Sequence, residues 1–112
     1  MAEVIDLAAP QGEGPLWGTA TEDLNATLLA WPAGHEVAEH VNDERDVLIV
    51  VLAGSASVTV DGAAHEVAAN RALVIEKGCS RAVRAGDQGV RYLSVHRRRG
   101  PLQLEGLESG AR

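Results

Sequence analysis

The stretch at residues 34–62, GHEVAEHVNDERDVLIVVLAGSASVTVDG, decides the fold of this chain. It contains the six apolar residues VLIVVL, whose β-branched side chains and short length favour a strand buried on both faces over a surface helix. The segment SASVTV that follows alternates polar and apolar residues, as a half-buried strand does. The pair Asp61 and Gly62 is a strong hairpin signal, and a two-residue turn there would place Val60 opposite Ala63.

Strand and turn signals continue on both sides of this stretch. Further strands are expected at the apolar or alternating segments 4–7, 16–17, 25–31, 72–75, 80–85 and 90–96. The first two form N-terminal edge strands within residues 1–24, and residues 100–112 lose the periodicity and are expected to fray. Strands at this regular spacing, with no helical period, predict one all-β sandwich or barrel domain spanning residues 1–112.

Composition narrows the class of protein. A formal net charge of −6 argues against a nucleic-acid partner, because binding to phosphates needs a basic surface. The apolar runs are too short to span a membrane, and the N-terminus lacks the basic region of a signal peptide. A single cysteine excludes an internal disulfide and fits a reducing compartment. These features predict a cytoplasmic protein without a membrane or nucleic-acid partner.

The spacing of the opening stretch resembles the first motif of the small cupins, which are double-stranded β-helix barrels of the jelly-roll type. In that motif a glycine is followed by His-x-His, a glutamate and a second glycine. Here Gly34, His40 and Gly54 match the pattern, whereas Asn42 replaces the second histidine and Val47 replaces the glutamate.

The segment EKGCSRAVRA resembles the second cupin motif in outline. Gly78 matches its glycine, but Glu76 replaces a proline, Arg81 stands at the last histidine and Ala85 replaces an asparagine. The resemblance covers residues 25–96, which it identifies as the barrel core. It implies a cupin-like jelly-roll barrel, and because small cupins are commonly homodimers it also implies a homodimer.

The resemblance also implies where a metal would sit, since cupins hold a transition metal with three imidazoles and a carboxylate. His40 alone carries over, and the permanent charge of Arg81 would repel a divalent cation at short range. Asp46 neighbours the glutamate position, but an offset of one residue turns a side chain to the opposite face of a strand. We therefore predict no metal and no other cofactor.

The same positions suggest a different site in the barrel interior. His40, Asn42 and Arg81 would converge near one mouth, where they combine imidazole, amide and guanidinium groups. Tyr92 and His96 share one strand face and could line the same cavity. The favoured hypothesis is that these five residues bind a small polar or anionic molecule, in a sensor or accessory role.

Three alternatives stay open at this point. In a purely structural arrangement, His40 and Asn42 satisfy each other, and Arg81 pairs with a carboxylate such as that of Glu44 or Glu76. In the second alternative His40 is a metal-free acid–base catalyst oriented by Asn42.

The third alternative is a metal-dependent cupin enzyme, either an oxygenase, an isomerase or a decarboxylase. It would hold a divalent transition metal with His40 and unconventional ligands such as Asp46, His65 or His96. His65 falls on the apolar face of its strand, where a core histidine is the simpler interpretation.

Cys79 lies two residues before Arg81, whose charge could lower the pKa of its thiol. Whether the chain is an enzyme therefore depends on groups that the motifs alone do not define.

Overall fold

The computed structural model describes residues 2–98, which contain strands and no helix and so confirm the predicted all-β class. The strands are β1 (Gly14–Ala20), β2 (Leu24–Trp31), β3 (Glu36–Val41), β4 (Val47–Val60), β5 (Ala63–Ala68), β6 (Ala72–Ile75) and β7 (Ser80–Arg97). Within residues 2–98 no helix has the length and apolarity needed to cross a membrane. The expected fraying of residues 100–112 lies outside the described range.

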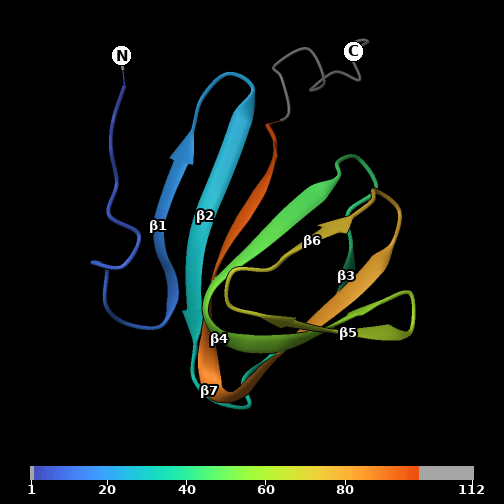
Figure 1. Cartoon of the computed structure of the whole chain (residues 1–112). Helices are drawn as coiled ribbons and strands as arrows, with labels where there is room; N and C mark the ends of the chain where they lie inside the picture. Colours follow the sequence, from blue (N-terminus) through green and yellow to red (C-terminus); the bar gives the residue numbers. More distant parts are fainter. Residues whose placement is uncertain (1, 99–112) are drawn as a thin grey trace, which may run out of the picture.

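All strand pairs are antiparallel, and two long strands connect the two layers of the barrel. One layer has the order β1-β2-β7-β4-β6 and uses the second half of β7 and the first half of β4. The other has the order β3-β7-β4-β5 and uses the remaining halves. Figure 1 shows β4 and β7 curving from one layer into the other. This is the jelly-roll barrel expected from the sequence.

The two long strands bend together at glycines. The ladder between β4 and β7 shifts register next to Gly54, and both Gly54 and Gly89 have positive φ, at 71° and 74°. A Cβ atom placed on Gly54 would overlap the carbonyl oxygen of Gly89, and one on Gly89 would lie 2.8 Å from the carbonyl oxygen of Trp31. The backbones therefore approach so closely at this bend that a side chain cannot be accommodated.

The hairpin forms with the predicted register, since Val60 pairs with Ala63 across a two-residue turn. Both turn residues have positive φ, 48° at Asp61 and 84° at Gly62, as a type I′ turn requires. The Asp61 carboxylate also accepts a hydrogen bond of 2.8 Å from the backbone nitrogen of Ser80. The turn is thereby attached to the start of β7.

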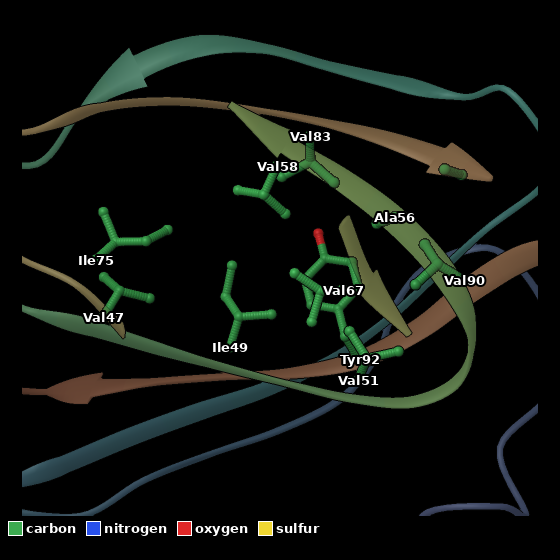
Figure 2. Packing of buried hydrophobic residues seen from close by; sticks show 11 residues of the cluster. Val47, Ile49, Val51, Ala56, Val58, Val67, Ile75, Val83, Val90 and Tyr92 are labelled. Atoms are coloured by element: carbon green, nitrogen blue, oxygen red, sulfur yellow. The ribbon is translucent and has the colours of Figure 1, made fainter. Parts of the chain in front are cut away.

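The core fills the space between the two layers, as Figure 2 shows. It is built almost entirely from aliphatic side chains, and Tyr92 is its one aromatic residue. Its buried members are Val47, Ile49, Val51, Ala56, Val58, Val67, Ile75, Val83, Ala85, Val90 and Tyr92. Because these residues alternate along their strands, they lie on one face of each strand, and that face points into the barrel.

Three sequence-based expectations about the strands were wrong. Residues 4–7 form no strand. The chain just after them is held by a side chain and not by a ladder, because Arg91 donates hydrogen bonds to the carbonyl oxygens of Ala8 and Pro10. The segments 80–85 and 90–96 belong to one strand, because the glycine bulge bends β7 without ending it. The VLIVVL run is buried on one face only, and Leu48 on its outer face is 37% exposed.

The bend predicts a large difference between two glycine substitutions. Gly54→Ala combines positive φ, which costs about 1–2 kcal/mol, with a clash against backbone, which costs a further ~1–3 kcal/mol. Gly78 has φ of 87°, but a Cβ atom there would meet nothing within 4 Å, so Gly78→Ala should cost only about 1–2 kcal/mol. Denaturant unfolding of both variants measures the difference. Equal losses of stability would contradict a close approach at Gly54.

The Asp61 contact predicts a pH-dependent contribution to stability. Hydrogen bonds from the Ser80 backbone, the Cys79 thiol and the Ser80 hydroxyl lower the pKa of Asp61 below its ordinary value of 3.8, although burial opposes them. The contribution is therefore fully present above pH 3.8 and is lost as the pH falls through the lower pKa of the folded state.

The Asp61→Asn variant tests this contribution, because asparagine tolerates positive φ and removes only the charge. It should melt at a lower temperature than the wild type at neutral pH. This difference in melting temperature should become smaller as acid protonates Asp61 in the wild type. Thermal unfolding across an acidic pH series measures it. A difference in melting temperature that is the same at every pH would show that the charge of Asp61 contributes nothing to stability.

Candidate functional site

The start of β7 and the end of β3 place His40 directly opposite Arg81. Arg81 lies two residues before the buried Val83, so its side chain belongs to the inner face of the barrel. The register shifts between Val37 and His40, and this bulge keeps both Val37 and His40 on that inner face. The two motif positions that lie far apart in the sequence therefore meet at one rim of the barrel.

A hydrogen bond joins the two side chains. Arg81 Nε donates to His40 Nε2 over 3.1 Å, and His40 Nδ1 lies 3.1 Å from the carbonyl oxygen of Ala38. Because the Arg81 group can only donate and the Ala38 group can only accept, His40 carries its proton on Nδ1 in this arrangement. Both nitrogens of the imidazole are thus engaged within the protein.

Arg81 is half-buried, and its burial lowers the pKa of its guanidinium group from the ordinary value. The charge of Arg81 in turn acts to lower the pKa of Tyr92, which places the two groups within electrostatic reach of each other. Among residues 2–98 no carboxylate forms an ion pair with Arg81, and this includes those of Glu44 and Glu76. The pairing that the structural alternative proposed is therefore wrong.

Asn42 shapes the loop after β3, and its side-chain hydrogen bonds go to that loop and not to His40. Its side-chain oxygen accepts hydrogen bonds from the backbone nitrogens of Glu44 and Arg45, at 3.0 and 3.2 Å. This local turn orders the rim beside the histidine. The result is an open depression of about 370 Å³ lined by His40, Val41, Asn42, Asp43, Glu44, Arg45 and Arg81.

Arg45 is a residue of this rim that the sequence-based prediction missed. It lines the depression, and its Nε atom is enclosed without a hydrogen-bond partner among the described residues. The only sequence signal was its place at the end of the polar loop NDER, where a solvated arginine would be equally common. Two arginines therefore line the depression, and one of them was expected.

Tyr92 lies deeper than the other predicted residues. It is 6% exposed, its hydroxyl points into the interior, and it accepts a hydrogen bond of 3.2 Å from Trp31 Nε1 (Figure 2). Burial raises the pKa of Tyr92, although the hydrogen bond from Trp31 and the charge of Arg81 act in the opposite direction. Tyr92 thus belongs to the core and does not line the open depression.

His96 is separated from the depression. It pairs with Val47 on one side and Asn25 on the other, and its Nδ1 lies 3.1 Å from the carbonyl oxygen of Arg97. It therefore lies in the other half of β7 from Arg81. Of the five predicted site residues, the structure gathers His40, Asn42 and Arg81 in one depression and leaves the other two outside it.

The residues at the cupin metal positions do not fit a metal ion. Val47, at the carboxylate position, is 2% exposed and belongs to the apolar core. Asp46 is turned to another part of the chain, where its Oδ1 accepts a hydrogen bond of 2.9 Å from the Lys77 backbone. Across residues 2–98 no three histidine, cysteine, aspartate or glutamate side chains come together. One imidazole beside a guanidinium is a poor ligand set for a divalent cation.

Two interpretations of single residues were also wrong. His65 pairs with Val58 but is exposed, because β5 is the outermost strand of its layer and only its Val67 reaches the core. The pKa of Cys79 is raised by its hydrogen bond to Asp61, and then by burial and by nearby carboxylates. A raised pKa disfavours the thiolate, so Arg81 does not activate this cysteine as a nucleophile.

Solved structures with the same arrangement of strands share little sequence with this chain. The cupin domain of Schizosaccharomyces pombe Cnp3 superimposes with a TM-score of 0.71 and 19% identity, covering 86% of this chain and 70% of that chain. A cupin-2 domain protein from Shewanella frigidimarina gives 0.62 and 16%, covering 71% and 76%. This chain has the cupin fold. The structure of KdgF from Halomonas sp. is also similar, with a TM-score of 0.69 and 19% identity over 76% of this chain and 78% of that chain.

No family model and no curated protein sequence matches the chain. The likeness therefore shows the cupin fold, and the chemistry of the site rests on the residues themselves.

Proposed function

We propose that this cupin-fold protein binds a small anion at the rim depression and acts as a sensor or accessory binding protein. One observation carries the proposal. Arg81 is half-buried on the inner face, its Nε is bound to His40, and its two terminal nitrogens make no hydrogen bond or ion pair with residues 2–98. A partly desolvated guanidinium with unused donors is an anion-binding group.

The energetics support an anion over a neutral ligand. Polar groups that lose water without gaining a partner destabilise the folded state, and for charged groups this penalty is largest. An anion at the depression would supply acceptors to Arg81 and a counter-charge to Arg45, which lines the same surface. Binding should therefore release part of a cost that the folded protein already bears.

We propose the rim, and not the deep interior of the barrel, as the binding position. Aliphatic side chains that are almost fully buried fill the interior of the barrel (Figure 2). The open depression lies instead beside the loop after β3. This position differs from the interior cavity that the family resemblance suggests.

Binding is favoured over acid–base catalysis by His40. In the structure Asn42 bonds to the loop backbone and does not orient the imidazole. Both imidazole nitrogens already have partners, so neither faces a reacting group.

We also propose that the chain is a homodimer, as the resemblance implies. The outer face of the first layer carries an uncharged row formed by Val95, Leu48 and Val74, which are successive partners across three strands. Leu48 is 37% and Val74 is 64% exposed. An apolar row that is continuous across a sheet face is suited to a second copy of the same surface.

Anion binding predicts a thermal shift that depends on Arg81. An anion at about ten times its Kd adds about 1.4 kcal/mol of stability, and each kcal/mol raises the Tm of a domain of this size by roughly 4–8 °C. We expect acetate or phosphate, compared with chloride at equal ionic strength, to raise the Tm of the wild type. The Arg81→Ala variant should lose this shift.

Arg84→Ala is the matched control for that experiment. Arg84 lies on the same strand but points outward, and it pairs with Glu36 at 3.6 Å between two exposed side chains. This variant should keep the full shift. If the shift is equal in wild type, Arg81→Ala and Arg84→Ala, the stabilisation is a general salt effect and the proposed function fails.

The dimer is tested by sedimentation equilibrium. The wild type should sediment as a dimer, and Val74→Lys should shift it toward monomer because it buries a charge in the apolar row. Val41→Lys changes a residue that is 50% exposed on β3, outside this face, and should leave the dimer intact. A wild type that is monomeric at all concentrations would refute the proposal.

A further inference from the structure

The hydrogen bond between Arg81 and His40 can form only while His40 is neutral. Arg81 Nε donates to His40 Nε2 over 3.1 Å, and an arginine nitrogen can donate but not accept. His40 Nδ1 lies 3.1 Å from the carbonyl oxygen of Ala38, a group that can accept but not donate. A further proton on the imidazole would therefore go to Nε2 and turn the acceptor of this bond into a second donor.

Protonation would reverse the interaction between the two side chains. The N–H groups of His40 Nε2 and Arg81 Nε would then face each other, each on a positively charged group. An anion placed between them would remove this conflict, because its oxygens can accept hydrogen bonds from both donors. The depression that the two residues line is open and has a volume of about 370 Å³, which leaves room for a small anion.

The anion would gain from the same proton. With His40 neutral, Arg81 can offer an anion its two terminal nitrogens but not Nε, which is bound to His40. With His40 protonated, Arg81 Nε and His40 Nε2 both become donors to the anion, and the depression gains a positive charge. A proton on His40 and an anion in the depression therefore stabilise each other, and by linkage each strengthens the binding of the other.

Other charged groups line this depression or the two that share Glu44 and Arg45 with it. They are Glu39 on β3, Asp43, Glu44, Arg45 and Asp46 in the loop after β3, Lys77 in the turn before β7, and Arg97 at the end of β7. Each acts on the His40 ring both with and without an anion in place. Their charges, and any pairing among them, thus affect how strongly the proton binds but do not reverse its effect on the anion.

The imidazole is the type of group in this site that a change of pH near neutrality ordinarily charges. Histidines ordinarily titrate between about pH 5 and about pH 8, carboxylates at lower pH, and ammonium and guanidinium groups at higher pH. Burial raises the pKa of Tyr92, and a hydrogen bond to Asp61 raises the pKa of Cys79, so both side chains stay neutral in this range. A pH effect on anion binding in this range would therefore report on histidine.

We propose that anion binding at the depression is coupled to proton uptake by His40. When His40 takes up a proton from solvent, its bond to Arg81 breaks and the two side chains hold the anion together; when the proton leaves, the bond reforms and the anion is released. The inference rests on the proposed function, because it describes how that same depression is regulated. The protein would then retain its anion at acidic pH and release it at alkaline pH.

Isothermal titration calorimetry with formate tests the coupling at about pH 5.5 and about pH 8, at equal ionic strength. Formate suits the test because it stays ionised throughout this range, so its own charge does not change. The wild type should bind formate at least about tenfold more tightly at the lower pH, the effect of one hydrogen bond to a charged group. Equal affinities, or a higher affinity at alkaline pH, would overturn the proposal.

Two histidine variants assign the proton. His40→Gln removes the titrating group but keeps an acceptor for Arg81, since glutamine has a carbonyl oxygen. It should bind formate equally at both pH values, with the affinity that the wild type has at alkaline pH. His65→Gln is the matched control, because His65 is exposed on β5 and lies outside the depression. This variant should keep the full pH dependence, and circular dichroism checks that both variants are folded.

A measurement on the wild type alone gives a second test that does not depend on a variant. If the proton and the anion bind together, the heat of formate binding at about pH 7 should change with the ionisation enthalpy of the buffer. The slope of that relation gives the number of protons exchanged, and it should show net uptake of up to about one proton per formate. A slope of zero, or net release of protons, would overturn the proposal.

The possible failures are distinguishable. Formate binding that is lost in Arg81→Ala but is equal at the two pH values would overturn the proton coupling and leave the proposed function standing. No binding of formate at either pH would overturn both. A pH dependence that persists in His40→Gln, or that is lost equally in His65→Gln, would overturn the role given to His40.

Discussion

The close approach of two backbones at Gly54 and Gly89 is the constraint on which the rest of this structure depends. Only β4 and β7 take part in both layers, and their shared ladder has to turn a corner without being interrupted. The turn requires positive φ on both strands and leaves no room for a Cβ atom on Gly54. A residue with a side chain at this point would either separate the strands or flatten the barrel.

The site is a consequence of that corner. Because β7 continues through the bend, its first half lies beside β3 and its second half beside β2. Arg81 is thereby carried to His40 while Tyr92 stays behind it in the core. The same frame that would gather metal ligands in a cupin with the full motifs gathers an imidazole, an amide and a guanidinium here. The fold and the chemistry of the site are therefore separable. The glycines determine the path of the strands, and a few side chains at the rim determine the charge of the depression.

Much of the frame could be predicted from the sequence because its signals are local. The turn at Asp61 and Gly62 depends on the φ preferences of two adjacent residues, and the strands depend on a period of two. The continuity of β7 could not be predicted in this way. Two glycines that flank a polar segment give the same local pattern whether a strand ends there or continues through a bulge. Which of the two occurs depends on pairing with the neighbouring strand, and local sequence does not encode that pairing.

The site was predictable in part, for a similar reason. Motif spacing aligned His40 with Arg81, and the register confirms that they are opposite each other. The partners of each side chain were not predictable, since they depend on atoms brought together by tertiary structure. The side chain of Asn42 forms hydrogen bonds with its own loop, and that of Asp46 with the Lys77 backbone. The Cys79 thiol forms a hydrogen bond with a carboxylate of the hairpin turn. Arg45 was missed because neither composition nor periodicity of the sequence indicates that a single Nε atom will be buried.

The central claim is that the Arg81–His40 hydrogen bond occupies the place of a metal ligand and presents the guanidinium end to an anion. Nitrogen-15 NMR of the histidine rings and arginine side chains, at a pH where imidazoles are neutral, tests it most directly. The account predicts that His40 is protonated on Nδ1 and that its Nε2 accepts a hydrogen bond from Arg81 Nε. A His40 ring protonated on Nε2, or an Arg81 Nε–H that exchanges as fast as that of exposed Arg84, would contradict it.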